Sequence, residues 1–445
     1  MASTSIYKTM VTATNRNIFT LSMWVKMAKT GSDLSAYQFC DFYVSGSIRI
    51  SLYHDPNDHL NCFMQGGGYD NNIFVTNAKY RDTSAWYHFV WRFDTTQATA
   101  SDRVRLYVNG ELATFSSTNY PSQNFNLQQG TSSYTQYIGR YGGNTNNNFE
   151  GLMSHIHFCD GYSYDASSFG ETDSTTGEWK IKTSPSVTYG NNGFFILKDG
   201  NSVTDHSGNN LSFSTGGTLT KTEDCPSNVF ATLNPLVPDA GSLTYSAGNT
   251  KQWVDTANWR SSFSTLGMTT GKYYFEVLKN AGSNTMIGVR GVEQSDGSLS
   301  GSGNDWVGAV STGWSLYNVD GVVKNNNSDV GSAIGTYAND DIIGCFLDCD
   351  NSKLYFSKNG TMLNTTGKSI TAGLTYMFGV SGHTTARLNC NFGNGYYDTT
   401  AVSTNSGNGY AGSDGNGIFS YSPNNITLDG SSKSFKALST KGLNT

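Results

Sequence analysis

The sequence predicts an all-β protein in which two antiparallel β-sandwiches follow one another along the chain. Asn-Gly dipeptides at 109–110 and 359–360 each end a segment with Leu-Tyr at its centre. Asn-Gly supplies the positive φ angles of a type I′ turn, so each dipeptide predicts a β-hairpin. The composition agrees, because 50 Gly, 26 Tyr and 24 Phe against 7 Pro favour strands joined by tight reversals. A chain of 445 residues is long enough for two or three domains.

The first half of the chain alternates apolar and polar residues with the period of a strand. Apolar side chains take the odd positions of residues 19–27, which predicts a half-buried strand with Trp24 on the opposite face. Residues 86–93 place three aromatic side chains on one side of a second strand, namely Phe89, Trp91 and Phe93.

Further strands of the first half are expected at 104–108, 137–143 and 151–158. Helical periodicity is nearly absent from the chain. Only residues 164–169 predict a single helical turn, with Asp165 as its N-terminal cap.

The second half repeats the strand pattern. Residues 271–277 alternate so that Tyr273, Phe275 and Val277 point inward. The segments that complete this second set are 313–321, 341–348, 353–360, 376–380 and 386–393.

The first set of segments resembles a known family. Residues 21–27, 86–94 with 104–110, and 149–157 are similar to a laminin-G-like, concanavalin A-like jelly roll over roughly residues 5–170. The continuation, in residues 159–179, 189–195 and 205–210, resembles a module of proteins from marine bacteriophages and related viruses.

The second set, taken in its order, resembles an SPRY domain, which is another concanavalin A-like sandwich. The two resemblances imply a jelly roll at 1–170, a connecting extension at 171–234 packed on it, and an SPRY-like sandwich at 235–398. Residues 399–445 are expected to form a Gly/Ser/Asn-rich link and a C-terminal segment that either packs back on the second domain or docks on a partner.

Composition argues against several classes of partner. A formal net charge of −6 disfavours nucleic acid, which requires a basic face. No segment approaches the roughly 18–20 apolar residues of a membrane span, and the first residues lack the apolar core of a secretory signal. The seven cysteines have irregular spacing, which predicts buried free thiols and a reducing compartment.

The sequence predicts no enzyme and no catalytic residues. Concanavalin A-like glucan hydrolases carry paired acids along one strand, about 5 Å apart. Here the glutamates stand singly, and Asp348 and Asp350 lie at the entry to a hairpin, where Asp is a common turn former.

Two weak candidates for a metal site arise, and no other cofactor is expected. His155 and His157 share a strand face and could both ligate a metal, although packing within a sheet is the better explanation of both. Asp55 and Asp58 offer clustered oxygens of the kind that Ca²⁺ takes, and a solvated turn accounts for the same residues.

Ligand-binding candidates are loop aromatics beside amide side chains. A sugar ring stacks its C–H face on an aromatic ring while Asn and Asp hydrogen-bond its hydroxyls. The same Asn and Gly residues also build turns, and Trp314 is expected in the core. The candidates are Tyr69, Asp70, Asn71, Tyr141, Asn144, Asn146, Asn147, Trp306 and Tyr317.

These observations predict a virion surface protein, whether a fibre, a tail-associated adhesin or a head decoration. It would assemble in the host cytoplasm, form a homo-oligomer on the particle, contact other virion proteins and bind host-surface glycan through sandwich loops. Adhesion-type domains with free thiols and no secretion signal suit a particle released by lysis. The alternatives are a purely structural virion protein and, third, a polysaccharide-degrading enzyme.

Overall fold

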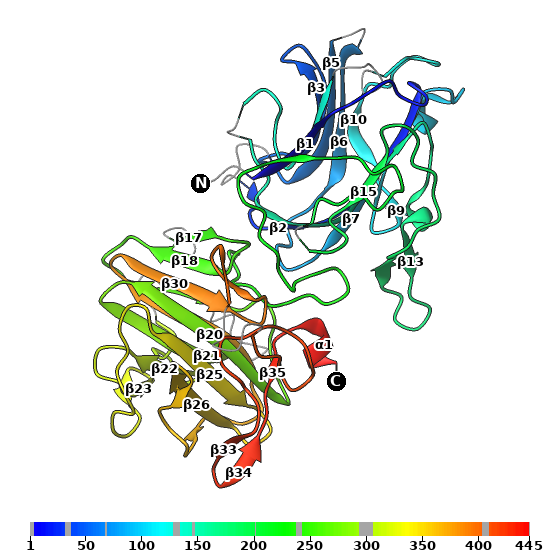
Figure 1. The fold of residues 1–445 in the computed structure, drawn as a ribbon. Helices are drawn as coiled ribbons and strands as arrows, with labels where there is room; N and C mark the ends of the chain where they lie inside the picture. Colours follow the sequence, from blue (N-terminus) through cyan, green and yellow to red (C-terminus); the bar gives the residue numbers. More distant parts are fainter. Residues whose placement is uncertain are drawn as a thin grey trace. The chain divides into compact units, whose positions relative to one another are not determined.

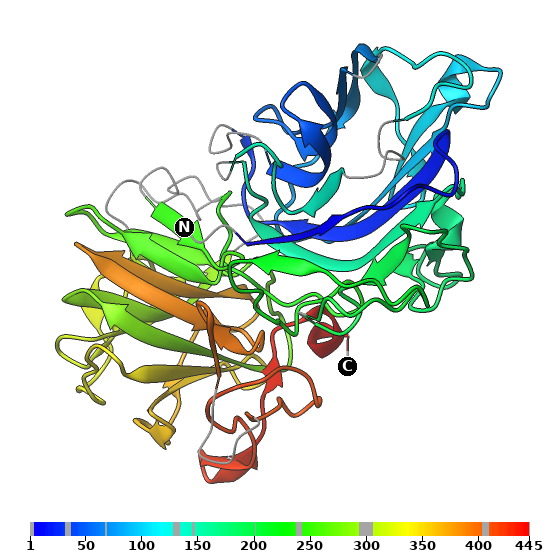
Figure 2. The same ribbon diagram turned by 45° about the horizontal axis from the view of Figure 1, so that its top comes forward.

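The computed structural model divides into two compact units, Met1–Lys221 and Thr222–Thr445. It describes residues 4–31, 37–66, 69–127, 134–144, 147–200, 202–236, 243–292, 306–402 and 409–444. Each unit consists of two layers of antiparallel strands, as Figures 1 and 2 show. In the described part of the chain the one α-helix is the short α1, Thr440–Leu443. The predicted all-β class with tandem sandwiches is therefore confirmed.

The first domain pairs an eight-stranded sheet with a six-stranded sheet. The larger has the order β10-β6-β5-β4-β3-β11-β1-β16. Its strands are Phe115–Thr118 (β10), Tyr69–Lys79 (β6), His59–Gly66 (β5), Ile48–His54 (β4), Tyr37–Ser45 (β3), Thr135–Ile138 (β11), Ser5–Thr9 (β1) and Ser214–Gly216 (β16).

The smaller sheet has the order β15-β12-β2-β7-β8-β9. Its strands are Phe194–Ile196 (β15), Gly151–Asp160 (β12), Ile18–Met27 (β2), Tyr87–Asp94 (β7), Val104–Val108 (β8) and Glu111–Leu112 (β9). A separate hairpin joins Gly170–Thr172 (β13) to Trp179–Ile181 (β14), and 3₁₀ turns lie at Ala100–Asp102 and Ala166–Ser168.

The core between these two sheets follows the predicted alternation. All odd positions from Phe19 to Met27 belong to one buried cluster, together with the predicted Phe89, Trp91 and Phe93. Rings meet across the layers, since the Phe19 ring of β2 lies 5.2 Å from the Phe42 ring of β3. Burial of such large apolar side chains supplies the main driving force for folding.

The expectation that strand 19–27 is half-buried is wrong, because its other face is covered too. Trp24 lies on the opposite face as predicted, but only 4% of it is exposed. It stacks on His88 with ring centroids 4.7 Å apart, and Trp179 donates its Nε1–H to His88 Nδ1 over 3.0 Å. Residues that follow the jelly roll thus form a second apolar layer on the six-stranded sheet, which includes Phe169, Trp179 and Tyr189.

The predicted turn at 164–169 is present as a 3₁₀ turn, but its predicted cap is wrong. The Asp165 carboxylate makes no capping hydrogen bond to the turn. Instead it accepts the Tyr107 hydroxyl over 2.7 Å and pairs with Arg92 at 3.3 Å. A charged partner on the adjacent sheet competes successfully with the local backbone amides.

The second domain has a nine-stranded sheet, whose main path is β17-β18-β30-β20-β25-β26-β27. β28 pairs with β26, and β35 runs parallel to β20. The strands are Leu243–Ser246 (β17), Lys251–Val254 (β18), Ala386–Asn391 (β30), Lys272–Ala281 (β20), Ile342–Asp348 (β25), Lys353–Lys358 (β26), Thr361–Met362 (β27), Lys368–Ser369 (β28) and Lys436–Ala437 (β35).

The facing six-stranded sheet has the order β19-β29-β21-β22-β23-β24. Its strands are Arg260–Phe263 (β19), Thr375–His383 (β29), Asn284–Val292 (β21), Gly313–Tyr317 (β22), Val323–Asn325 (β23) and Ser328–Asp329 (β24). Two small hairpins join Tyr396–Tyr397 (β31) to Thr400–Ala401 (β32) and Ile426–Leu428 (β33) to Ser431–Lys433 (β34).

The core of the second domain also follows its predicted pattern. Tyr273, Phe275 and Val277 point into it, and Trp314 is buried there as expected. Phe275 stacks on Phe378 of the facing sheet with centroids 4.3 Å apart. The seven cysteines are all free, five of them fully buried, which agrees with their predicted role as small apolar side chains.

The C-terminal segment, residues 409–444, packs back on the outer face of the nine-stranded sheet. Tyr274 and Phe346 point outward from β20 and β25 and join Phe419, Leu428 and Phe435 in a buried cluster. Apolar burial on both faces makes β20 and β25 central to the domain.

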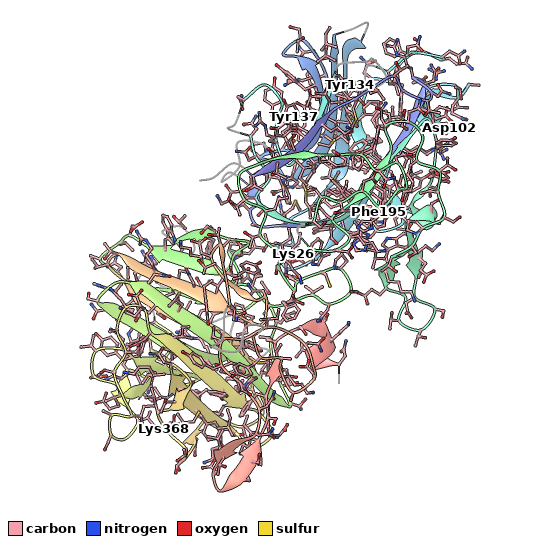
Figure 3. The ribbon with its side chains drawn as sticks, viewed as in Figure 1. Lys26, Asp102, Tyr134, Tyr137, Phe195 and Lys368 are labelled. Carbon is pink, nitrogen blue, oxygen red and sulfur yellow. The ribbon has the colours of Figure 1, made fainter. Side chains whose placement is uncertain are left out.

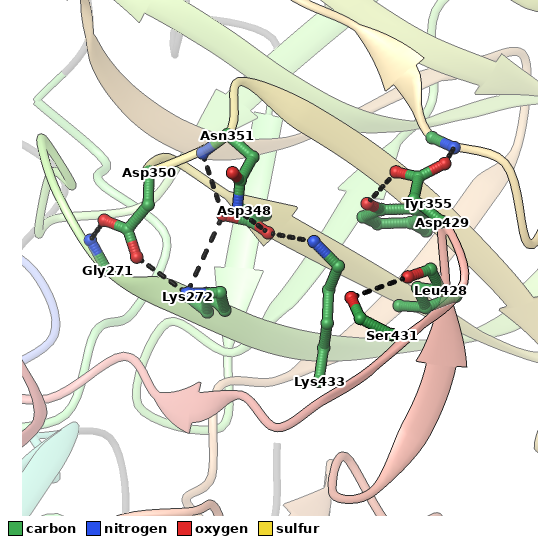
Figure 4. Close-up of polar contacts among 11 residues, drawn as sticks. Gly271, Lys272, Asp348, Asp350, Asn351, Tyr355, Leu428, Asp429, Ser431 and Lys433 are labelled. Atoms are coloured by element: carbon green, nitrogen blue, oxygen red, sulfur yellow. Dashed lines mark hydrogen bonds and ion pairs between the residues drawn. The ribbon is translucent and has the colours of Figure 1, made fainter.

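Polar side chains also hold this segment in place (Figure 4). Lys433 of β34 pairs with the fully buried Asp348 at 2.8 Å. Asp429, in the turn before β34, accepts the Tyr355 hydroxyl over 2.6 Å. Asp350 instead accepts from Lys272 and the Gly271 amide, so both acids of the 348–350 pair have structural partners.

The two predicted Asn-Gly hairpins are confirmed. Asn109 and Asn359 both have φ of 49°, and the glycines that follow, Gly110 and Gly360, have φ of 87° and 81°. Positive φ at both central residues defines the type I′ turn.

Each turn is tied to the neighbouring strand in the same way. The Asn109 amide donates to the His88 carbonyl over 2.9 Å, and the His88 amide donates to Asn109 Oδ1 over 2.8 Å. Asn359 makes the same two bonds with Ile342, both at 2.8 Å. The two domains therefore repeat the same local arrangement as well as the general fold.

A further shared feature leads to a prediction. A Cβ added to Gly360 would lie 2.5 Å from the Tyr421 ring, as one on Gly110 would from Trp179. Gly360→Ala is expected to lower the free energy of unfolding by about 2–3 kcal/mol, from the left-handed φ and the ring overlap. Gly373, with φ of 80° and open space around its Cβ, is the matched control and should lose about 1 kcal/mol. Equal losses in urea denaturation would show that the ring contact contributes nothing.

Candidate functional site

The outer face of the eight-stranded sheet carries a continuous set of aromatic and arginine side chains. Alternation sends Ile6, Phe42, Ile50 and Ile138 into the core, so their neighbours point outward. We call this set the tyrosine–arginine stripe, and it consists of Tyr7, Tyr43, Arg49, Phe63, Tyr137, Arg140 and Tyr141.

Strand register brings the stripe together from five strands and one loop. Tyr7 of β1 lies directly opposite Tyr137 of β11, and Tyr43 of β3 lies opposite Arg49 of β4. Phe63 comes from β5, next to β4. Tyr137 is labelled in Figure 3, on the side of the first domain where β1 runs.

The rings of the stripe contact one another. The Tyr7 and Tyr137 centroids are 5.6 Å apart, and Tyr43 meets Tyr137 at 6.4 Å. Tyr141 meets Tyr43 edge-on at 5.8 Å. These centroid distances fall in the range that aromatic pairs prefer, so the rings hold each other in place.

Both arginines of the stripe lie over aromatic rings. The Arg49 guanidinium is 4.6 Å from the Tyr141 centroid and 5.4 Å from that of Phe63. The Arg140 guanidinium is 4.8 Å from the Tyr137 centroid. Contacts of this length are favourable cation–π interactions, which fix the guanidinium groups without neutralising them.

A buried carboxylate beneath the stripe holds the loop that carries Tyr141. Asp41 is fully buried, and it accepts the Gly142 amide over 2.8 Å and the Ser51 hydroxyl over 2.7 Å. Burial raises the pKa of Asp41 to about 6, against the opposing effect of these hydrogen bonds and of Arg49. A bridge between Arg140 and Asn148 closes the base of the same loop.

The tyrosine hydroxyls of the stripe are open. Among the described residues, the hydroxyls of Tyr7, Tyr43, Tyr137 and Tyr141 make no hydrogen bond within the chain. Some other half-buried tyrosines use their hydroxyls internally, as Tyr107 does toward Asp165 at 2.7 Å. The stripe therefore presents flat rings together with donors and acceptors that are free for a ligand.

A second aromatic cluster lies on the second domain. The Trp259 ring is 6.3 Å from Trp306, 6.0 Å from Tyr317 and 5.6 Å from His383. All four side chains are half-buried. Tyr317 donates its hydroxyl to Asn284 over 2.6 Å, so this cluster is more fully bonded than the stripe.

The buried Arg290 secures the position of Trp306. Its guanidinium donates to the carbonyls of Trp306 and Val307, and it lies 4.9 Å from the Phe263 ring. The Val307 amide donates to Ser381 over 2.9 Å. The segment that carries Trp306 is thus fixed to the outer face of the six-stranded sheet.

Several predicted site residues can now be placed. Tyr141 belongs to the stripe, while Asn144 and Asn147 lie in its loop, where the Asn147 carbonyl accepts the Tyr141 amide over 3.2 Å. Trp306 and Tyr317 come together through Trp259. The backbone of Tyr69, Asp70 and Asn71 begins β6, but their side chains, like all of Asn146, lie outside the described residues.

Most of the stripe was missed by the sequence prediction, which considered loop aromatics only. Tyr7, Tyr43, Arg49, Phe63 and Tyr137 are strand residues. The available signal was period-two alternation in 5–9, 41–43 and 48–52, which sets an aromatic or Arg opposite each core position.

The two calcium candidates use their oxygens within the chain. Asp55 Oδ1 accepts the amides of Asn57 and His59, both over 2.9 Å. Asp58 has φ of 71° and pairs with Arg81 at 2.6 Å. No group of three His, Cys, Asp or Glu among the described residues could hold a metal ion.

His155 and His157 have other partners as well. His157 stacks on Phe195 with centroids 3.9 Å apart and bonds the Tyr189 hydroxyl over 2.9 Å. His155 lies at a bulge in β12, with φ of 48°, and bonds Ser154 over 2.7 Å. Burial lowers the pKa of His155 to about 4 and that of His157 well below its usual range.

Sequence-family profiles match both halves of the chain. The profile of the concanavalin A-like lectin/glucanases superfamily, Laminin_G_3, matches residues 3–162. The SPRY domain profile matches residues 272–395. No curated protein matches the chain. Fold and profiles together define a concanavalin A-like domain followed by an SPRY domain, and domains of these kinds serve binding or protein–protein interaction.

The solved structures that are similar to this chain include two SPRY domains. The SPRY domain of human HERC1 is 14% identical with a TM-score of 0.29, and the match covers 36% of this chain and 96% of that one. The TRIM65 PSpry domain is 16% identical with a TM-score of 0.29, and the match covers 36% of this chain and 88% of that one. In the described part of the chain, no helix has the length and apolar character needed to cross a membrane.

Proposed function

We propose that this chain is an adhesin that binds glycan on the outer face of the eight-stranded sheet of its first domain. The observation that carries the proposal is the tyrosine–arginine stripe, with its mutually packed rings and its tyrosine hydroxyls free of internal partners. Sugar rings stack their C–H faces on aromatic rings, and their hydroxyls bond phenol and guanidinium groups. Five residues of the stripe lie on strands and the loop of the other two is held by Asp41, so the stripe is preorganised for binding.

The setting that best suits such a protein is the surface of a virion. Support comes from two binding-type domains in tandem, from seven free thiols, and from the resemblance of residues 159–210 to a module of bacteriophage proteins. Many weak glycan contacts on one particle would add through avidity, so a single site need not bind tightly. The partners on this proposal are host-surface glycan and other virion proteins.

Removal of one stacking ring tests the proposal. Tyr137→Ala is expected to weaken binding to a glycan array about fivefold, because one ring contact is worth on the order of 1 kcal/mol. Tyr410, which is 40% exposed on the second domain, supplies the control Tyr410→Ala, and its binding should not change. An array that retains neither the parent chain nor the variant would contradict glycan binding.

A structural role as a docking protein of the virion is the second candidate. The cluster of Trp259, Trp306, Tyr317 and His383 favours it, since fixed half-buried aromatics are typical of protein interfaces. Host envelope should retain an adhesin, whereas a docking protein should be retained by virion components alone. We also propose that binding occurs without catalysis, and release of reducing ends from polysaccharide would contradict this.

A further inference from the structure

We propose that the stripe selects acidic polysaccharides, whose sugar units carry sulfate or carboxylate groups, over neutral ones. This inference rests on the proposed glycan-binding function and narrows its ligand class. The juxtaposition that carries it is that of Arg49 and Arg140, each fixed over a tyrosine ring of the stripe and neither in an ion pair with an acid among the described residues.

Four other arginines of the first domain have internal partners, whereas Arg16, outside the stripe, has a buried Nε without a partner among the described residues. Three of them form ion pairs with carboxylates, namely Arg81 with Asp58, Arg92 with Asp165 and Arg105 with Asp102. Arg103 donates to three backbone carbonyls, those of Gln97, Ala98 and Pro121.

Arg49 and Arg140 keep most of their donors available. Arg140 donates Nε–H to the Tyr141 carbonyl over 3.2 Å, and the described residues offer it no carboxylate. Arg49 Nε is buried without a hydrogen-bond partner in the described part of the chain, so only the terminal NH₂ groups of Arg49 can meet a ligand. A guanidinium has five N–H donors in a planar fork that matches carboxylate and sulfate oxygens.

The charge of this sheet also favours an acidic ligand, although the whole chain has a net charge of −6. Its eight strands contain only two acidic residues, Asp41 and Asp70. Asp41 is fully buried and occupied by the Gly142 amide and the Ser51 hydroxyl, so it exposes no charge to a ligand. Among the described side chains, the exposed charge at the stripe is that of the two arginines.

Spacing and surroundings indicate a sugar chain as the source of the anion. The rings on β1, β11, β3 and β5 lie beside two guanidinium groups, Arg49 on β4 and Arg140 in the loop after β11, which suits a polymer that presents both ring faces and acidic groups. Single-stranded nucleic acid also combines rings with anions, but it needs a broad basic groove. Three basic residues, Lys8, Arg49 and Lys79, in eight strands do not provide one.

Binding of the full-length chain to matched polysaccharides tests the inference. The probes are a sulfated galactan, the same galactan after desulfation, polygalacturonate, and a poly(dT) oligonucleotide. We expect the two acidic chains to bind at least about tenfold more tightly than the desulfated one, from one or two charge-assisted bidentate contacts. Arg49→Gln and Arg140→Gln should each weaken binding of the acidic chains about tenfold and weaken binding of the neutral chain much less, because glutamine can still hydrogen-bond a sugar hydroxyl.

Arg81→Gln is the matched control, since Arg81 is an exposed arginine of the same domain that already has an acidic partner. Arg81→Gln should change the affinity for neither the acidic nor the neutral polysaccharides.

A loss of affinity in Arg81→Gln as large as that in Arg49→Gln would overturn the inference, as would tighter binding of poly(dT). Equal binding of the sulfated and desulfated galactans would overturn acidic selectivity and leave glycan binding intact. Retention of no polysaccharide at all would instead overturn the proposed function. Should Arg49→Gln fail to fold, Arg140→Gln carries the test, because Arg140 lies in a loop.

Discussion

Replacing Glu276 with alanine is expected to lower the free energy of unfolding of the second domain by about 4 kcal/mol. Glu276 lies on β20, is fully buried, and points to the outer face that the C-terminal segment covers. Its Oε1 accepts the Tyr274 hydroxyl at 3.0 Å and the Tyr421 amide at 2.9 Å. The alanine variant would leave a cavity with several unsatisfied donors, each of which costs about 1–3 kcal/mol when buried.

The other carboxylate oxygen of Glu276 is equally engaged. Oε2 accepts from Asn391 Nδ2 at 3.1 Å, the Tyr397 hydroxyl at 2.7 Å and the Ser420 amide at 2.9 Å. Two of the five bonds to Glu276 therefore come from backbone amides of residues 420–421. The side chain joins β20 to the C-terminal segment, so its loss should release that segment as well as destabilise the sheet.

Glutamine at position 276 gives a graded comparison. If the glutamine amide nitrogen takes the place of Oε1, its N–H faces the N–H of Tyr421, and two donors cannot form a hydrogen bond. The Tyr274 hydroxyl, by contrast, can rotate and accept a hydrogen bond from the new amide. We expect the glutamine variant to lose about 2 kcal/mol of the free energy of unfolding, so its stability lies between those of the parent and the alanine variant. Hydrogen exchange of β20 and C-terminal peptides in urea would measure each value. Asp255, which is exposed and paired with Arg387, gives the control Asp255→Asn, expected to lose less than about 1 kcal/mol.

The importance of Glu276 could not be read from the sequence. Alternation correctly places Tyr273, Phe275 and Val277 in the core, and the same rule puts Glu276 on the other face, where a charged residue reads as solvent-exposed. What buries it is residues 409–444, which are more than 130 positions away and lack a periodic pattern. Pattern reasoning predicts which residues share a face, but not which distant segment covers that face.

The same limitation explains the errors in the first domain. The face of β2 that carries Trp24 reads as exposed, yet residues after 160 cover it with Phe169, Trp179 and Tyr189. The candidate site was missed for a related reason, since Tyr7, Tyr43 and Tyr137 are isolated in sequence and meet only through strand register. Turn chemistry, by contrast, is local, so the Asn109 and Asn359 hairpins were predicted correctly.

The first domain is expected to lose stability in mild acid by several kcal/mol more than the second between pH 6.5 and pH 4. His88 is fully buried against Trp24, donates from Nε2 to Ser22 at 2.8 Å and accepts Trp179 Nε1–H at Nδ1. Its ring is therefore neutral in the folded state. Burial lowers the pKa of His88 to about 3.

The sign of this effect follows from proton binding. An unfolded histidine takes up its proton near pH 6.5, whereas folded His88 stays neutral until about pH 3, so acid stabilises the unfolded chain. The contribution of His88 alone is about 3 kcal/mol at pH 4. His155 acts in the same direction with a pKa of about 4, and burial also lowers the pKa of His54 and His157.

Two carboxyl groups of the same domain act in the opposite direction. Burial raises the pKa of Asp41 to about 6 and raises that of Asp160, so both favour the folded state as pH falls. At pH 4, protonation of Asp41 stabilises the folded state by about 2–3 kcal/mol. This gain is smaller than the stability that the domain loses through His88 and His155 together. Four histidines with a lowered pKa against two carboxyl groups with a raised pKa leave a net loss of stability in acid.

His88→Gln separates this mechanism from general acid sensitivity. The variant should be less stable at pH 7, because it loses the ring stack, but its stability should fall less steeply between pH 6.5 and pH 4. His383→Gln, at the half-buried histidine of the second domain, should leave the slope of the first domain unchanged. Hydrogen exchange of β2 and β7 peptides at several pH values, corrected for intrinsic exchange, provides the slopes. An unchanged slope in His88→Gln would mean that the other buried histidines or the carboxyl groups control the response to acid.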